Sequence, residues 1–218
     1  MFPTGRKIAV PALLTILATG LAGCSSVGEF DETGGISAIR SACPTVEVAA
    51  ATGNVTLFNP PTSRDARAID VEASLTNVRS TCNDQSDDIA TNITFEVRAR
   101  RASAAGARDV TLPYFIAVMQ GGSAVVAKRV GHVTLHFDAG QSRASATATG
   151  DASVSKAAAT LSKEVRDKLT EKRKAGDADA ATDPLTRPDI RQAVARATFE
   201  ALVGFQLTDD QLKYNATR

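Results

Sequence analysis

The chain has 218 residues, and its 25 Lys and Arg residues nearly balance its 24 Asp and Glu residues. A near-neutral surface argues against nucleic acid or bulk anionic lipid as the partner. The length suffices for one hydrophobic core, so a single domain is expected.

The first segment has the pattern of an export signal. Arg6 and Lys7 form a positive n-region, and residues 8–20 form an apolar h-region. This stretch is too short for a transmembrane helix, which needs about 20 apolar residues. We therefore expect residues 1–23 to be a signal peptide that is removed from the mature protein.

The sequence Leu21-Ala22-Gly23-Cys24 resembles the lipobox of the bacterial lipoprotein family. The resemblance implies cleavage before Cys24, a diacylglyceryl group on its thiol, and acylation of its new amine by a fatty acid such as palmitate. Because each buried methylene contributes about 0.8 kcal/mol, several acyl chains give stable anchoring. Ser25 stands where Asp would favour inner-membrane retention, so we expect the outer membrane, facing the periplasm. The alternative is an ordinary cleaved signal peptide, with Cys24 as part of the mature chain.

Two cysteines then remain, Cys43 and Cys82. In an oxidising compartment an even pair predicts a disulfide. It would close a loop of about 38 residues, for which the chain-entropy model gives roughly 4 kcal/mol. The alternative is a redox or metal pair, which lacks both a Cys-x-x-Cys motif and a nearby His. Residues 24–42 mix Gly, Ser and acidic residues and indicate a flexible tether before a single domain over 43–218.

From residue 44 onward the pattern predicts strands. Apolar and polar residues alternate over residues 46–48, 55–57, 69–76, 93–100 and 124–137. Residues 110–119 are apolar on both faces, which predicts a strand that is covered on each side. Residues 144–148 form a weaker candidate strand.

The last third of the chain predicts helices around one more strand. Apolar residues at helical spacing indicate an amphipathic helical insertion over about 153–174, followed by a linker over 175–188 and a short helix over 188–196. Residues 199–207 alternate as a strand, although residues 193–202 could also continue a helix. Thr208 and Gln211 match a capping box, which predicts a terminal helix over 209–214 that docks Leu212 and Tyr214 on the domain.

About seven short strands separated by turns predict a mainly β fold, an antiparallel β-sandwich that is immunoglobulin-like in general plan. The chain has no Trp, so the Cys-Trp-Cys signature of antibody domains is absent. The segments Cys43-Pro44, Leu112-Pro113-Tyr114-Phe115 and Val203-Gly204-Phe205-Gln206-Leu207-Thr208 are similar to uncharacterised envelope lipoproteins of alphaproteobacteria. That resemblance implies no activity.

Three groups of polar residues are candidate sites. His132 and His136, the only histidines, would lie on one strand face about 13 Å apart, too far to share a metal without a bulge. The acidic residues 83–88 offer oxygen ligands for a cation but lack EF-hand spacing, so a solvated hairpin turn is the preferred interpretation. The basic residues Arg98, Arg100, Arg101 and Arg108 could contact phosphates, but a solubilising strand face is preferred.

No motif identifies a reaction, so no catalytic residue, metal or cofactor is assigned. We expect a non-enzymatic binding or scaffolding module at the outer membrane, with an envelope protein as the possible partner. The alternative is a carrier or sensor of a small apolar or lipid ligand, held between the sheets or under the helix. A third class, a periplasmic hydrolase, rests only on the presence of Ser, His and Asp, since no Gly-x-Ser-x-Gly occurs.

Overall fold

The computed structural model describes residues 29–30, 36–37, 41–171, 176 and 182–217. The chain divides into two compact units, residues 1–39 and 40–218. In the first unit the two-residue strands β1 (Glu29–Phe30) and β2 (Ile36–Ser37) pair antiparallel. The segment predicted to be an irregular tether therefore contains a short ladder. All other elements belong to the second unit.

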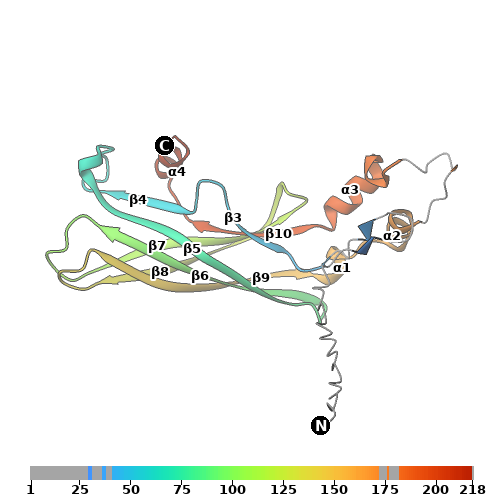
Figure 1. Ribbon diagram of the computed structural model, residues 1–218, viewed down its shortest axis with the longest axis horizontal. Helices are drawn as coiled ribbons and strands as arrows, with labels where there is room; N and C mark the ends of the chain where they lie inside the picture. Colours follow the sequence, from blue (N-terminus) through green and yellow to red (C-terminus); the bar gives the residue numbers. More distant parts are fainter. Residues whose placement is uncertain (1–28, 31–35, 38–40, 172–175, 177–181, 218) are drawn as a thin grey trace, which may run out of the picture. The chain divides into compact units, whose positions relative to one another are not determined.

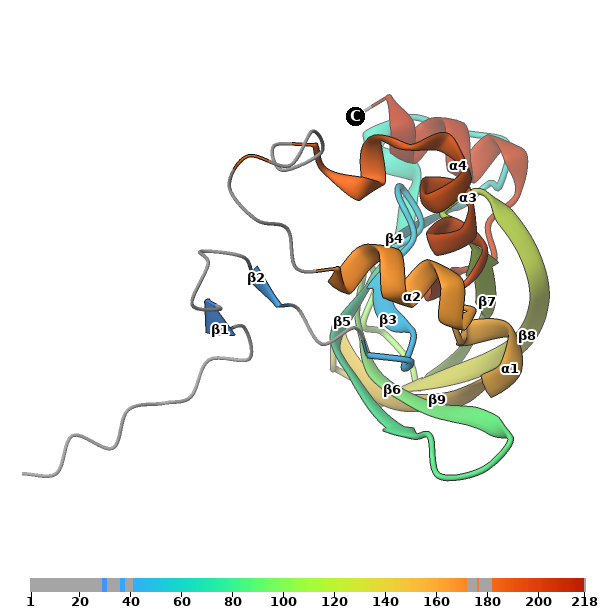
Figure 2. The same ribbon diagram turned by 90° about the vertical axis from the view of Figure 1, so that its right-hand side faces the viewer.

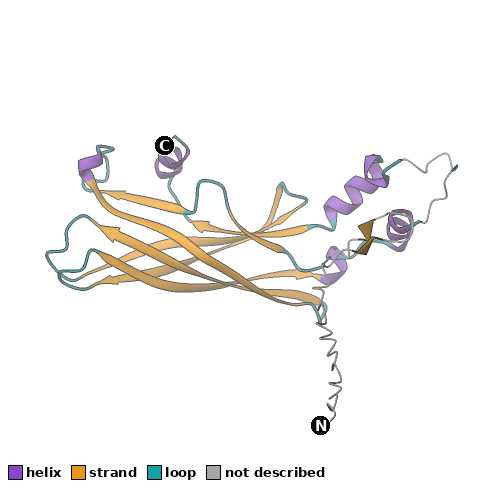
Figure 3. Ribbon diagram, in the orientation of Figure 1, coloured by secondary structure: helices purple, strands orange, loops and turns teal. Residues whose placement is uncertain are grey.

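Two four-stranded sheets form the second unit (Figures 1 and 3). The first sheet is antiparallel and has the strand order β4-β5-β6-β9, with bounds Asn54–Phe58, Ile69–Asn83, Asp88–Arg101 and Arg143–Ser155. The second has the order β3-β10-β7-β8, with bounds Thr45–Val48, Phe199–Phe205, Arg108–Gln120 and Ala124–Phe137. The predicted β-sandwich is confirmed, with one departure from antiparallel pairing, because β3 and β10 run parallel.

The core consists of alternate residues of both sheets, because successive side chains of a strand point to opposite faces. Phe95, Phe137 and Phe205 are the largest fully buried side chains and fill the space between the sheets. Tyr114 packs edge-to-face on Phe95, with ring centroids 5.0 Å apart, and its hydroxyl donates to the Thr149 carbonyl over 2.7 Å. Gly131 is required beside this ring, since a Cβ there would lie 2.5 Å from the Tyr114 Cζ.

The helix predicted over 153–174 is wrong at its beginning. Residues up to Ser155 extend β9, and Ala152 and Val154 point into the core. Two separate helices follow, α1 (Lys156–Ala159) and α2 (Lys163–Thr170). Ser162 separates them, because its hydroxyl accepts a hydrogen bond from the Val165 amide and caps the beginning of α2. The end of the predicted helix, at residues 172–174, lies outside the described residues.

The other predicted helix of this region is confirmed as α3 (Pro188–Arg196), preceded by a short 3₁₀ turn, η2 (Pro184–Thr186), inside the predicted linker. Helices α1, α2 and α3 lie at the end of the sandwich where β9 ends and β10 begins (Figures 1 and 2). Ala159 of α1 and Ile190 of α3 are buried, whereas α2 buries no residue. Helix α1 contacts β9 and places Ala159 in the core cluster, whereas the contacts of α3 include η2.

The C-terminal helix α4 (Asp209–Ala216) begins with the predicted capping box. Thr208 Oγ1 accepts from the Gln211 amide, and Gln211 Oε1 accepts from the Thr208 amide. Tyr214 packs on Phe58 of β4, as expected of a docked helix. Leu212 differs from the prediction, because 41% of it remains exposed.

The predicted disulfide between Cys43 and Cys82 is present, with Cα atoms 6.1 Å apart. Cys43 comes two residues before β3 of the second sheet, and Cys82 lies on β5 of the first sheet. The bond therefore joins the two sheets near the beginning of the sandwich domain.

Candidate functional site

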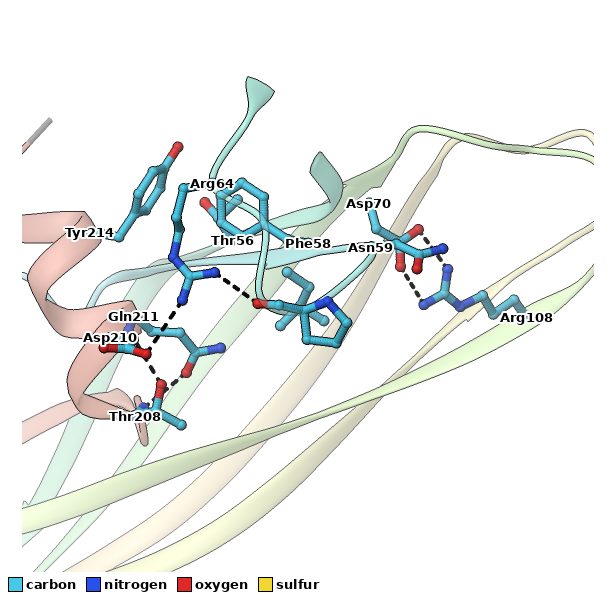
Figure 4. A pocket seen from close by; sticks show the side chains of 12 residues that line it. Thr56, Phe58, Asn59, Arg64, Asp70, Arg108, Thr208, Asp210, Gln211 and Tyr214 are labelled. Atoms are coloured by element: carbon cyan, nitrogen blue, oxygen red, sulfur yellow. Dashed lines mark hydrogen bonds and ion pairs between the residues drawn. The ribbon is translucent and has the colours of Figure 1, made fainter. Parts of the chain in front are cut away.

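A pocket opens beside α4, where this helix lies against β4 (Figure 4). Its volume is about 650 Å³, within the range of roughly 300–1,000 Å³ that is typical of small-molecule sites. We call it the α4 pocket; it is lined by Thr56, Leu57, Phe58, Asn59, Pro61, Arg64, Asp70, Arg108, Thr208, Asp210, Gln211 and Tyr214. These residues come from β4, the β4–β5 loop, the beginning of β5, the beginning of β7, and α4 with its cap.

One wall of the α4 pocket combines two aromatic rings with a guanidinium group. The rings of Phe58 and Tyr214 meet edge-to-face with centroids 5.2 Å apart, and the Arg64 Cζ lies 5.2 Å from the Phe58 centroid. Arg64 also donates to the carbonyls of Pro61 and Ser63 in its own loop. Its Nη2 lies 3.7 Å from Asp210 Oδ2 on α4. Arg64 therefore connects the β4–β5 loop to the C-terminal helix.

A bidentate ion pair marks another part of the pocket lining. Arg108 at the beginning of β7 donates to both carboxylate oxygens of Asp70 on β5, over 2.8 and 2.7 Å. The hydrogen bond from Arg108 lowers the pKa of Asp70 below its ordinary value, although partial burial of the carboxylate opposes this. The same hydrogen bond raises the pKa of Arg108. Both shifts move away from neutral pH, so this pair is suited to holding the sheets together rather than to proton transfer.

The composition of the α4 pocket limits what it could bind. Aromatic faces, hydroxyls, two side-chain amides and paired charges suit a small ligand that has both a planar apolar part and a polar or charged group. They do not match the deep apolar cavity expected for a lipid. The space between the sheets is filled by large side chains of the core.

The two histidines lie on the exposed face of β8, as predicted. His136 Nδ1 lies 2.5 Å from Asp109 Oδ1, and His136 Nε2 lies 3.4 Å from Asp138 Oδ1. The hydrogen bond with Asp109, and then the charge of that carboxylate, raises the pKa of His136. Within the described part of the chain, no group of three or more His, Cys, Asp or Glu residues could hold a metal ion.

The four arginines that were the alternative phosphate-contacting patch are not a cluster of unpaired cations. Arg98, Arg100 and Arg108 pair with Glu96, Glu72 and Asp70 respectively. Arg101 is buried, with its Cζ 5.1 Å from the Phe137 centroid, and it donates to the carbonyls of Gln141 and Asp138. The structure thus favours the interpretation of Arg98 and Arg100 as part of a solvated strand face.

The acidic segment 83–88 forms the hairpin turn between β5 and β6. The Asn83 side chain accepts from the Gln85 amide, and the Ser86 hydroxyl donates to the Asp88 carbonyl. Lys156 of α1 donates to the Asp84 carbonyl. These bonds stabilise the turn through the Asn83 and Ser86 side chains and two backbone carbonyls.

The first seven residues of β8 form an exposed strand edge that sequence reasoning missed. Every residue from 124 to 130 is exposed, and the valines Val125, Val126 and Val130 are 60%, 51% and 53% exposed. We call residues 124–130 the β8 edge. This strand is the outermost of the second sheet, and among the described residues no strand pairs with its outer side.

A β-bulge lies within this exposed stretch. Val118 pairs with Ala127 and Met119 pairs with Val125, which leaves Val126 as an additional residue in a β-bulge. On the outer face of the sheet, Val130 lies opposite Phe115, and the Lys128 Nζ lies 4.7 Å from the Phe115 centroid. The face of β7 that carries Phe115 lies outside the core cluster, so the prediction of a strand covered on each side is only half met.

The remaining edge strands differ from β8. β3 has only four residues, and β4 is accompanied by α4. The exposed side chains of β9 belong mainly to Ser, Thr, Arg and Asp. Short length, covering elements and polar side chains are the usual protections of a sheet edge. β8 has a bulge, two basic residues and contacts with β9, including the pair of Arg129 and Asp151, but it still leaves three valines more than half exposed.

The α4 pocket was also missed, because its lining comes from segments far apart in the sequence. The β8 edge left a signal: Val133, Leu135 and Phe137 keep the two-residue alternation of a half-buried strand, whereas Val125 and Val126 are adjacent and break it. Cys24 lies outside the described residues.

Comparisons of this chain with protein-family models, with curated proteins and with solved structures find no match. A search of the described helices finds none with the length and hydropathy needed to span a bilayer.

Proposed function

We propose that this protein is a lipid-anchored component of the bacterial cell envelope whose sandwich is a non-enzymatic binding or scaffolding module. The sequence Leu21-Ala22-Gly23-Cys24 supports attachment to the outer membrane through Cys24, with the domain facing the periplasm. The near balance of charges supports a protein partner rather than nucleic acid.

The observation that carries this proposal is the β8 edge. Three valines that are each more than half exposed lie on one seven-residue stretch of an outermost strand. Clustered exposed apolar residues on an outermost strand are a feature of protein interaction sites. A module that presents such an edge to the periplasm is suited to hold another envelope protein.

Site-specific cross-linking in cells tests the proposal. A photoreactive amino acid is placed at Val126 in one variant and at Thr134, an exposed residue farther along the same strand, in a control variant. We expect a reproducible cross-link to one envelope protein from position 126 and none from position 134. Equal labelling from both positions, or no product from position 126, would contradict the proposal.

A second candidate function is recognition of a small ligand, and the α4 pocket is the observation that favours it. Its mixed lining favours an amphipathic ligand with a planar apolar part over a purely apolar one. Native mass spectrometry of protein purified from its membrane tests this, with Tyr214→Ala as the comparison. A bound mass that the variant loses would support the ligand function, and the absence of any retained mass in both proteins would count against it.

A further inference from the structure

We propose that the outer face of the second sheet holds an amphipathic helix of the partner, whose apolar stripe is flanked by acidic residues on one side and by basic residues on the other. The inference rests on the proposed function and names the structure and chemistry of the partner beside the β8 edge. Three properties of this face lead to it: its apolar residues, its charges and its size.

Apolar residues of three neighbouring strands share this face. In β7, residues 114, 116 and 118 belong to the core cluster, whereas residues 115, 117 and 119 lie on the other side of the sheet. Residues directly opposite one another in a ladder point to the same face, so the register adds residues of β8 and β10. We call this set the outer apolar face; it consists of Phe115, Ala117, Met119, Val125, Val130 and Leu202. Since Val125 and Val130 are 60% and 53% exposed, the face presents apolar surface to solvent.

Charged residues of opposite sign border the outer apolar face. Lys128 of β8 is opposite Ala117 of β7. Ala117 is in turn opposite Leu202 of β10, and Leu202 is opposite Glu47 of β3. Glu200, two residues before Leu202, adds a second carboxylate on the side away from β8. Among the described residues, no ion pair includes any of these three charged side chains. Charge complementarity then predicts carboxylates where the partner meets β8 and Lys or Arg where it meets β3 and β10.

Lys128 is free to turn toward such a partner. Its Nζ lies 4.7 Å from the Phe115 centroid, and a cation–π contact is weak at an exposed site. The register puts Lys128 on the same face as Val130, so one partner segment can contact both. Arg129 lies on the opposite face, where it pairs with Asp151 of β9, and it takes no part.

The size of the face favours a single helix. Neighbouring strands lie about 4.8 Å apart, so the three spacings from β8 to β3 amount to about 14 Å. An α-helix with its side chains is about 10–12 Å wide, so a helix lying between Lys128 and Glu47 can reach both. Along the strands, residues 115–119 span about 14 Å, which corresponds to roughly two and a half helical turns. The apolar stripe of a short helix therefore covers the outer apolar face.

Two other occupants fit this face less well. Its planar area is about 200 Å² from the dimensions above, whereas a stable dimer buries about 800 Å² of accessible surface on each partner, so a second copy of this chain would have to bury mainly polar surface around it. An anionic membrane surface would meet the carboxylates of Glu47 and Glu200 with like charge. A helix with both signs of charge avoids both costs.

Photo-cross-linking of defined peptides to the full chain in detergent micelles tests the inference. The probe is a helical peptide with a Leu stripe that includes one photoreactive residue, Glu along one side of the stripe and Lys along the other. One control peptide has Lys along both sides, and another has Ser in place of the Leu residues. Mass spectrometry locates the cross-link on the protein. The unchanged protein is compared with Lys128→Glu and with Lys213→Glu on α4, an exposed site with the same change of charge. Because the micelles take up each peptide equally in all samples, differences between the proteins report binding to the face.

We expect the probe to cross-link to residues 115–119, 125–130 or 200–204. Lys128→Glu should weaken binding of the probe by about threefold or more, because like charges then face each other. The same variant should bind the peptide with Lys on both sides more tightly than the unchanged protein does, since that peptide then meets carboxylates at both borders of the face. Lys213→Glu should behave like the unchanged protein, and the Ser peptide should lose binding.

Cross-links confined to other surfaces, equal binding of the probe and the Ser peptide, or unchanged affinities in Lys128→Glu would overturn the inference. Two further results would assign the face to another occupant and overturn it as well. One is labelling of phospholipid in native membranes from a photoreactive residue at Val130. The other is a dimer in sedimentation experiments that Lys128→Glu dissociates. If the in-cell cross-link from Val126 to an envelope protein persists in any of those cases, the proposed function stands and only the docked helix fails.

Discussion

At the scale of single residues, the pair of Asp70 and Arg108 illustrates how polar groups support this sandwich. Asp70 is the second residue of β5 in the first sheet, and Arg108 is the first residue of β7 in the second sheet. Their bidentate contact therefore joins the sheets at the end of the sandwich near the α4 pocket. The Asp70 side chain is only 19% exposed, so its carboxylate depends on this partner more than a surface carboxylate would.

This dependence predicts a change of stability with pH. Because the folded-state pKa of Asp70 is lowered, its stabilisation is fully present above the unfolded pKa near 4 and is lost as pH falls through the folded pKa. Asp70→Asn should therefore lower the free energy of unfolding by about 1 kcal/mol at pH 7, and the difference from the unchanged protein should shrink below about pH 4. Urea unfolding at several pH values measures it.

The matched control is Asp87→Asn in the exposed β5–β6 turn, which should change the unfolding free energy little at any pH. A difference for Asp70→Asn that stays constant down to pH 3 would show that the lost contact does not involve the ionised carboxylate.

At the scale of elements, α4 is held mainly by contacts near its two ends. Its first turn contains the capping box of Thr208 and Gln211. In its last turn, Asn215 donates to the carbonyls of Ala51 and Asn54. Tyr214 supplies the aromatic contact to Phe58. A helix of eight residues is too short to be stable alone, so these contacts decide whether it forms a wall of the α4 pocket.

Thr208→Ala should therefore destabilise α4 and the pocket together. Removing the hydroxyl that accepts from the Gln211 amide should cost about 1 kcal/mol and speed hydrogen exchange in α4. Thr208→Ser keeps the hydroxyl and should behave like the unchanged protein. Faster exchange throughout both sheets, rather than in α4, would contradict this local role of the cap.

The elements differ in how far they could be predicted from the sequence. Strands with one wet face, such as β6, were found because alternation is a local property of the chain. The boundary near Ser155 was missed because Ala and Ser residues at 152–158 fit helical spacing as well as strand alternation. Pairing of Val154 with Ile89 on β6 decides for the strand, and that neighbour is remote in the sequence.

The candidate sites show the same difference between local patterns, which can be predicted, and contacts between remote residues, which cannot. The capping box and the disulfide were predicted because their partners follow from short motifs or from counting cysteines. The α4 pocket could not be predicted, since Phe58, Arg108 and Tyr214 meet only after the sandwich has closed. The arginines were identified, but the carboxylate partners of Arg100 and Arg108, which are Glu72 and Asp70, lie on another strand, β5.

At the scale of the whole molecule, the four outermost strands of the two sheets differ in how their edges are protected. Three of them are short, accompanied by a helix or lined by polar side chains, whereas β8 presents valines over residues 124–130. The β8 edge does contain Lys128 and Arg129, but its other five residues are Ala and Val, which is more apolar surface than an edge protected only against association would show. The asymmetry is therefore better explained by a surface that is kept for a partner.

Attachment at Cys24 would concentrate that surface at the membrane, and it leads to the last prediction. Cys24→Ala removes the thiol that accepts the diacylglyceryl group, so the protein should move from the membrane fraction to the soluble periplasmic fraction. The Cys43–Cys82 disulfide lies within the sandwich domain, so the released protein should unfold at the same urea concentration as detergent-solubilised native protein. Ser25→Ala, the neighbouring change, should leave the protein in the membrane. Retention of Cys24→Ala in the membrane fraction would mean that another segment holds the protein there, and the β8 edge would then require a different account of its orientation.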